Sequence, residues 1–194
     1  MEQPEKSKQI AHLGGQLIIG VACCVSLVFI FFLPATPQTS TTSSQAVQSC
    51  RQFTRDFYDW YVPYTQKRLR VPASDVAIKR KAEVFSPGLL RALKLDSEAQ
   101  ARTKGEIVGL DFDPFISGQD PFAHYAVRRV TLKAGRCFAE VWHVAADDKA
   151  RKPDAIAEST EQEGRWRFVN FHYPDENTDL VSVLSVLRKE RSKP

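Results

Sequence analysis

The sequence lacks the spacings that identify common catalytic and metal sites. No His-x-x-x-His, Cys-x-x-Cys or Gly-x-Ser-x-Gly pattern occurs in its 194 residues, so zinc hydrolysis and the serine nucleophile of the α/β-hydrolases have no support. Its four histidines are scattered along the chain, at His12, His124, His143 and His172. We therefore expect a non-enzymatic protein without a cofactor.

The chain also has little excess charge of either sign. It carries 27 Lys and Arg against 23 Asp and Glu, a net charge of +4. Beyond two short clusters at residues 79–81 and 188–191, which we interpret as solvated helix faces, the basic residues are spread along the chain. A nucleic-acid binder usually concentrates them in one stripe. We therefore expect no nucleic-acid partner.

Only one long apolar run is present. Residues 13–33 contain no charged side chain, and a helix of this length spans about 31 Å, the thickness of a bilayer's hydrocarbon core. The apolar region of a cleaved signal peptide is shorter, about 7 to 15 residues. We predict an uncleaved transmembrane helix. A cleaved signal peptide and a lipoprotein signal with Cys23 as the lipidated residue are the alternatives.

The charges around this run predict its orientation. Lys6 and Lys8 precede it, and no basic residue follows it until Arg51. Because positive residues flanking a membrane helix stay inside, residues 1–12 should be a cytoplasmic tail. The predicted topology is a single membrane crossing, with the C-terminal part on the side opposite the cytoplasm.

Two further regions follow the run. Residues 34–45 are mainly Ser, Thr, Pro and Gln, a composition typical of a flexible linker. Residues 46–194 then form one soluble domain, in which helical periodicity comes first and strand patterns follow. We predict helices over 46–64, after 74, from 87 to before 105, and after 178, and strands over 107–112, 124–133, 136–145, 155–160 and 165–173. This order favours an α+β fold with helices packed on a curved antiparallel sheet.

Three stretches of the domain form a recognisable set. They are FYDWYV at 57–62, VFSPGLL at 84–90 and DFDPFISGQD at 111–120, and the last of them is the most specific. Together with WRFVN at 166–170 they resemble one bacterial family, the domain of unknown function numbered 3828, over about residues 47–187. The resemblance implies an exported or lipid-anchored envelope protein with a cone-shaped fold similar to nuclear transport factor two, and no assigned activity.

The most polar part of the last stretch is the candidate binding site. It contains Asp111, Asp113, Gln119 and Asp120, whose oxygens suit a partner or a hard cation. The calcium-hand spacing fails, because Phe115 and Ile116 stand where an oxygen ligand and a glycine are needed, so we predict no metal. The remaining interpretations are a binding surface and carboxylates that build the loop.

If the carboxylates build the loop, two structural features are expected. Pro114 fixes its own φ and Gly118 permits a positive φ, so the stretch should form a defined loop. The carboxylates of Asp113 and Asp120 should accept backbone N–H bonds within it.

The cysteines outside the apolar run are Cys50 and Cys137. An even number of cysteines in an oxidising compartment favours a disulfide. The alternative is a buried strand residue at Cys137 and an exposed thiol at Cys50.

Our functional hypothesis is an envelope binding or scaffolding module, with the inner membrane and another envelope protein as partners. Anchored domains of similar layout serve as assembly factors in type IV secretion channels. One alternative is a small-ligand enzyme on a cone fold, with Asp59 or Asp111 near His143 as the base. Another is an immunity protein.

Overall fold

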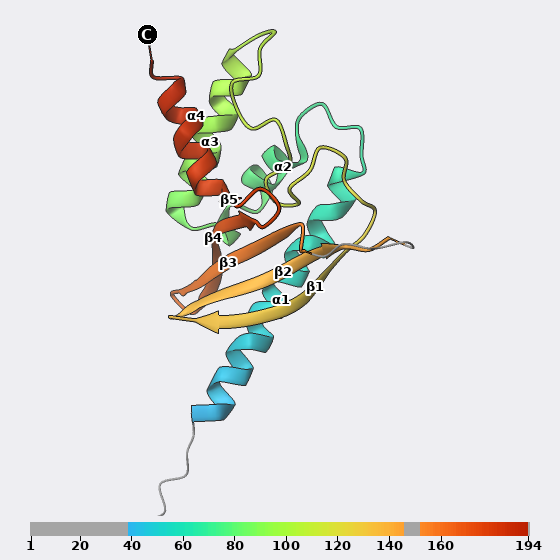
Figure 1. Cartoon of the computed structure of the whole chain (residues 1–194), viewed down its shortest axis with the longest axis vertical. Helices are drawn as coiled ribbons and strands as arrows, with labels where there is room; N and C mark the ends of the chain where they lie inside the picture. The colour runs from blue at the N-terminus through green and yellow to red at the C-terminus, as the bar shows by residue number, and fades with distance from the viewer. Residues whose placement is uncertain (1–38, 146–151, 194) are drawn as a thin grey trace, which may run out of the picture. The chain divides into compact units, whose positions relative to one another are not determined.

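The computed structural model describes residues 39–145 and 152–193, which belong to the C-terminal of two compact units. These residues form four α-helices, one short 3-10 helix and a single antiparallel sheet of five strands (Figure 1). The predicted α+β class with an antiparallel sheet is therefore confirmed.

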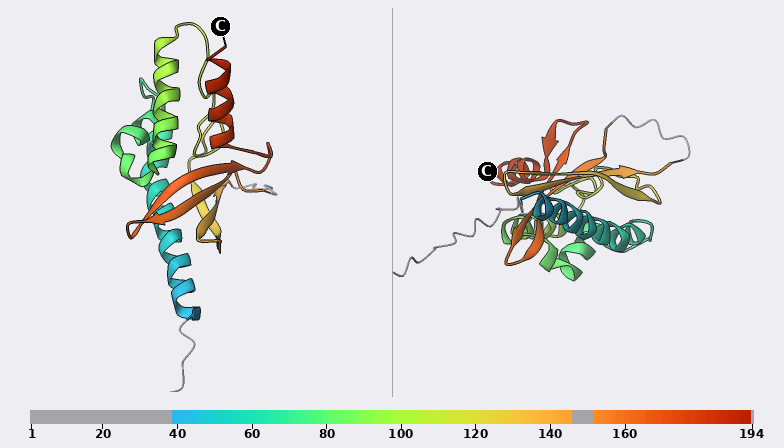
Figure 2. Two further views of the ribbon diagram at one scale, coloured as in Figure 1. Left: turned by 90° about the vertical axis from the view of Figure 1, so that its left-hand side faces the viewer. Right: turned by 90° about the horizontal axis from the view of Figure 1, so that it is seen from below.

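The longest element is α1 (Thr39–Thr65), which runs across one face of the sheet and contacts β1 and β2 (Figure 2). Its buried side chains recur at the helical period and include Thr54, Phe57, Tyr58 and Tyr61. This agrees with the helix predicted over residues 46–64, and a helix that buries a largely aromatic stripe gains its stability mainly from packing.

The linker predicted over residues 34–45 is wrong in its second part. Residues 39–45 belong to α1, and residues 34–38 lie outside the described residues. Once the aromatic part of α1 is docked, each residue added at its N-terminal end gains one backbone hydrogen bond. Serine and threonine lose only a few tenths of a kcal/mol relative to the best helix formers, so their composition does not prevent the extension.

Three helical elements follow: α2 (Ala73–Arg80), η1 (Ala82–Val84) and α3 (Pro87–Arg102). Helix α3 starts at the predicted residue. The Ser86 side chain caps it by accepting a hydrogen bond from the backbone N–H of Leu89 at 3.3 Å, and Pro87 occupies the first turn. The last helix, α4 (Leu180–Glu190), has Asp179 as its N-cap and packs beside α3 (Figures 1 and 2).

The strands pair with their sequence neighbours in the order β1-β2-β3-β4-β5. Their bounds are Tyr125–Lys133, Arg136–His143, Ala155–Gln162, Arg165–Tyr173 and Thr178–Asp179. Two tight hairpins connect neighbouring strands: Ala134 and Gly135 join β1 to β2, and Glu163 and Gly164 join β3 to β4, all with positive φ. Such angles match the right-handed twist of paired strands.

One predicted strand is absent from the structure. Residues 107–112 form no strand, because side chains of α3 take their backbone amides. Gln100 Oε1 accepts from the N–H groups of Val108 and Gly109 at 2.8 and 3.0 Å, and Asp96 Oδ2 accepts from that of Leu110 at 2.9 Å. A backbone satisfied in this way has no need of a sheet partner.

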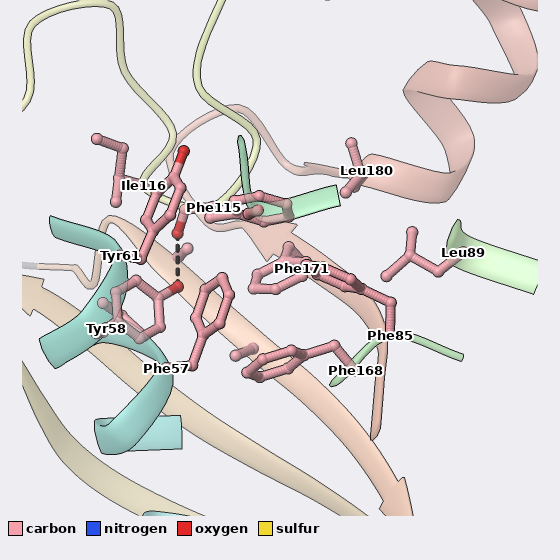
Figure 3. Close-up of a cluster of buried hydrophobic side chains, with 14 of the residues drawn as sticks. Phe57, Tyr58, Tyr61, Phe85, Leu89, Phe115, Ile116, Phe168, Phe171 and Leu180 are labelled. Carbon is pink, nitrogen blue, oxygen red and sulfur yellow. Dashed lines mark hydrogen bonds between the residues drawn. The ribbon is translucent and has the colours of Figure 1, made fainter. Parts of the chain in front are cut away.

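The main core lies between α1, α3 and the sheet, where phenylalanine rings meet (Figure 3). Phe57 contacts Phe85, Phe115 and Phe168, with ring centroids 4.9–5.9 Å apart. A smaller cluster, formed by Val127, Val130 and Ala139 with two cysteines, lies elsewhere under α1. Its cysteines, Cys50 of α1 and Cys137 of β2, are joined in a disulfide with their Cα atoms 6.6 Å apart.

The predicted cytoplasmic tail (1–12) and transmembrane helix (13–33) lie outside the described residues. Within residues 39–145 and 152–193, every helix is too short or too polar to cross a bilayer.

Candidate functional site

A cavity of about 740 Å³ lies between α2, α3 and the segment that follows α3. Its walls are contributed by Thr65, by residues 70–78 before and within α2, by the second half of α3, and by residues 107–121. The last of these segments includes the polar stretch singled out in the sequence. The lining residues include Arg70, Val71, Asp75, Ile78, Leu93, Asp96, Ser97, Ile107, Asp111, Asp113 and Gln119. A cavity of this size and mixed lining is typical of small-ligand sites.

One wall of the cavity is a loop that tyrosines hold to the core. The hydroxyl of Tyr58 donates to the carbonyl of Phe115 (Figure 3), and that of Tyr173 donates to the carbonyl of Pro114 at 2.8 Å. A third hydroxyl, that of Tyr61, donates to Asp113 Oδ2. Because Pro114, Phe115 and Ile116 are themselves buried, this wall is fixed by the core rather than by solvent-exposed contacts.

Asp113 is the carboxylate that organises the loop. Its Oδ1 accepts from the N–H of Phe115 at 3.0 Å, and its own N–H donates to the carbonyl of Gly118 at 2.9 Å. Burial raises the pKa of Asp113 to about 6, although the hydrogen bonds from Tyr61 and Phe115 act in the opposite direction. Burial and the nearby Asp113 charge also raise the pKa of Tyr61 well above its ordinary value, so its hydroxyl remains a donor.

The tight turn of this loop differs from the expectation in one residue. Ser117, rather than Gly118, has the positive φ, at 51°. The bridge between Asp113 and Gly118 closes the turn, and the left-handed backbone position within it falls on Ser117. A polar residue tolerates the left-handed backbone conformation at a modest cost in free energy, which the surrounding hydrogen bonds offset.

The other predicted site residues have different positions. Asp111 and Gln119 are exposed and line the cavity, and Gln119 Nε2 donates to the backbone carbonyl of Asp111 at 3.0 Å. Asp120 is exposed and is not among the lining residues. Its carboxylate accepts no backbone N–H bond in the described part of the chain, so that expectation is wrong. The structure therefore brings Asp111, Asp113 and Gln119 together and leaves Asp120 outside.

A second anchor holds the segment that enters the loop, and sequence reasoning missed it. Asp96 is buried on α3, where its Oδ1 pairs with Arg191 Nη1 at 2.7 Å. The same Arg191 nitrogen donates to the carbonyl of Val108 at 2.7 Å. One signal was present in the sequence: Asp96 continues the apolar stripe of Leu89 and Leu93 at helical spacing, where a buried carboxylate requires partners.

Gly109 is predicted to be essential to this anchor. A Cβ at this position would lie 2.9 Å from Asp96 Oδ2 and 3.2 Å from Gln100 Cβ, and both side chains are held by hydrogen bonds. We expect Gly109→Ala to lower the free energy of unfolding by about 1–3 kcal/mol through overpacking. Gly88→Ala is the matched control in denaturant unfolding, because no atom lies within 4 Å of its Cβ position. Equal stability of the two variants would contradict the prediction.

His143 does not have the predicted surroundings. Among the described residues, the carboxylate of Asp154 lies beside it, with His143 Nδ1 2.9 Å from Asp154 Oδ1, and the His143 ring stacks on that of Phe122 at 4.1 Å between centroids. Asp59 is exposed on α1, and Asp111 lines the cavity. The cone-fold enzyme hypothesis placed Asp59 or Asp111 beside His143, whereas the structure places Asp154 there.

No cluster of three or more His, Cys, Asp or Glu side chains that could hold a metal ion occurs among the residues that the structure describes. Neither a protein-family model, nor a curated protein, nor a solved structure matches the chain. The resemblance to the family of unknown function and to cone-shaped folds therefore stays a prediction, and the site is interpreted from its own geometry.

Proposed function

We propose that this chain is a membrane-anchored envelope protein whose domain binds a ligand or partner without transforming it. The observation that carries the proposal is the cavity of about 740 Å³ with one wall fixed to the core by three tyrosines. A preformed wall lowers the ordering cost of binding, which favours a recognition site.

The hydrogen bonds of Asp113 support a binding role over a catalytic one. Both of its carboxylate oxygens accept hydrogen bonds from the fold, one from Tyr61 and one from Phe115. A general base must be free to take a proton from its substrate. A proton-transfer enzyme is the second candidate, because a cavity-lining carboxyl with a pKa raised to about 6 is suited to that chemistry near neutral pH.

The experiment that tests the function is a melting-temperature screen of the full chain against small molecules. We expect stabilising compounds whose effect disappears in Ser97→Trp, which fills the cavity from α3. Val186→Trp, on the exposed side of α4, is the control and should leave the effect unchanged, because a ligand stabilises only through its own site.

The compounds themselves then discriminate the two candidates. Recovery of a hit unchanged after incubation supports a binding protein, and its conversion to a product supports the enzyme. Hits that survive in Ser97→Trp would contradict the proposed site.

The proposed location is the inner membrane, with residues 13–33 as a single transmembrane helix, the N-terminus in the cytoplasm and the domain in the periplasm. The disulfide between Cys50 and Cys137 supports this location, because disulfides persist in oxidising compartments.

The topology makes a direct prediction. A reporter that is active only outside the cytoplasm, fused after Pro194, should be active, because Lys6 and Lys8 retain the tail on the inner side. Deletion of residues 13–33 should abolish this activity and serves as the control. An inactive full-length fusion would overturn the orientation, and a mature N-terminus at or after Ala35 would overturn the anchor.

A further inference from the structure

The charge of the cavity wall is opposite in sign to that of the chain. The chain has a net charge of +4, whereas the described lining contains one basic residue, Arg70, and four acidic ones, Asp75, Asp96, Asp111 and Asp113. A cavity whose lining carries mainly charges of one sign concentrates ligands of the other sign.

These four carboxylates differ in how they are paired. Asp96 is paired with Arg191, and Asp113 accepts hydrogen bonds from Tyr61 and Phe115. Asp75 and Asp111, in contrast, make no side-chain hydrogen bond or ion pair within residues 39–145 and 152–193. Asp75 lies in the first turn of α2 and Asp111 in the segment after α3, so two different walls each supply one unpaired acceptor.

The rest of the lining is largely apolar. Ile78 and Leu93 are buried, whereas Val71 and Ile107 are 51% and 72% exposed and come from different segments of the chain. Exposed aliphatic side chains that line a concave site gain free energy when a ligand covers them. The lining thus combines carboxylates with apolar surface.

We propose that the cavity binds a small organic cation, a primary amine on an apolar body. Its ammonium group would donate to Asp75 and Asp111, and its body would lie against Leu93, Val71 and Ile107. The inference rests on the proposed binding function and names its ligand class. A volume of about 740 Å³ is in the range of small-molecule sites, which favours a small ligand over a polypeptide segment.

The charge arrangement separates this ligand from its isosteres. Hydrogen bonds between an ammonium group and carboxylates are the strong, charge-assisted kind. A neutral molecule of the same shape loses them, and an anion additionally meets repulsion from the unpaired carboxylates. The preference should therefore follow charge rather than shape.

The test uses the full chain and three molecules of nearly equal shape: 2-phenylethylamine, 2-phenylethanol and phenylacetate. We expect calorimetric titration to give a Kd for the amine at least roughly tenfold lower than for the alcohol, since tenfold corresponds to one charge-assisted hydrogen bond. Phenylacetate should bind more weakly than either. Equal affinities for the three molecules, a preference for phenylacetate, or no binding of the amine would each overturn the inference.

Substitutions then assign the effect to the two carboxylates. Asp75→Asn and Asp111→Asn should each raise the Kd of the amine several-fold and leave that of the alcohol unchanged. Asp120→Asn is the matched control, because Asp120 belongs to the same loop but does not line the cavity; it should have no effect. Amine affinity that is unchanged in both Asp75→Asn and Asp111→Asn would contradict the assignment.

The two levels of the proposal fail differently. If Ser97→Trp removes binding of all three molecules and they bind equally, the cavity is a ligand site and the cation inference is wrong. If all three molecules still bind to Ser97→Trp, the amine binds outside the cavity and the cation inference is also wrong. The binding function itself is then decided by the melting-temperature screen of small molecules.

Discussion

Cys137→Ala is expected to lower the free energy of unfolding by about 4–5 kcal/mol. The disulfide closes a loop with a sequence separation of 87 residues, and in the chain-entropy model a loop of that length restricts the unfolded chain by this amount. Denaturant unfolding of the oxidised full chain and of the variant measures the difference. The effect should be large because most small domains are stable by only about 5–15 kcal/mol.

Two controls separate the disulfide from the packing of the thiol. Reduction of the wild type should reproduce most of the loss, and Cys50→Ala combined with Cys137→Ala should lose little more than the single variant, because the bond is already absent. Identical unfolding of oxidised and reduced wild type would contradict the prediction, as would free thiols detected at Cys50 and Cys137 themselves in the unreduced, denatured chain.

The position of the disulfide explains why it should matter. It joins the N-terminal half of α1 to β2, within the smaller cluster that contains Val127, Val130 and Ala139. The large aromatic core lies further along α1, around Phe57 and Tyr61. Few apolar side chains hold this half of α1 to the sheet, so the covalent bond replaces packing that the sequence does not provide.

Local features of the fold could be predicted from the sequence because local physics determines them. Ser86 and Pro87 begin a helix through a side-chain cap and a preset φ, whatever the rest of the chain does. Ala134-Gly135 and Glu163-Gly164 form hairpin turns because two-residue connections between twisted strands require positive φ. The aromatic stripe of α1 was likewise visible as a period.

Features that depend on distant partners could not be predicted. Residues 107–112 have a strand-like composition, yet Asp96 and Gln100 take their amides. The bond between Tyr61 and Asp113 joins residues 52 positions apart, and the cavity exists only where α2, α3 and the loop meet. Sequence reasoning found Asp111, Asp113 and Gln119 by composition and missed Asp75 and Asp96, which tertiary packing brings to the same cavity.

The last prediction concerns Asp113, whose substitution should reveal whether the loop is built by this carboxylate. Asp113→Ala removes the acceptor of Tyr61 and of the Phe115 N–H, and leaving such donors unsatisfied costs about 1–3 kcal/mol each. We expect a loss of roughly 2–4 kcal/mol in the free energy of unfolding at neutral pH. Asp120→Ala, at an exposed position in the same loop, should stay within about 0.5 kcal/mol of the wild type.

The pH dependence gives a second, independent signature. The pKa of Asp113 is raised from 3.8 to about 6 by burial, so the folded chain holds this proton more tightly than the unfolded chain does. Its contribution is therefore fully present below pH 4 and is lost as the pH rises through 6. A shift of this size corresponds to at most about 3 kcal/mol, and solvent access to the half-buried group should reduce it to about 1–2 kcal/mol.

Asp113→Asn isolates this contribution, because the amide has the same shape and does not titrate. Burial acts to raise the pKa of Asp179, but hydrogen bonds from Asn170 and Ser182 lower it overall. The stability that Asp179 contributes to the fold is therefore lost as the pH falls. Since both proteins contain Asp179, the difference between their unfolding free energies cancels it. We expect the wild type to lose about 1–2 kcal/mol relative to Asp113→Asn between pH 4 and pH 7.5. A difference that stays constant with pH would show that the Asp113 carboxyl is not held in the buried environment that fixes the wall of the cavity.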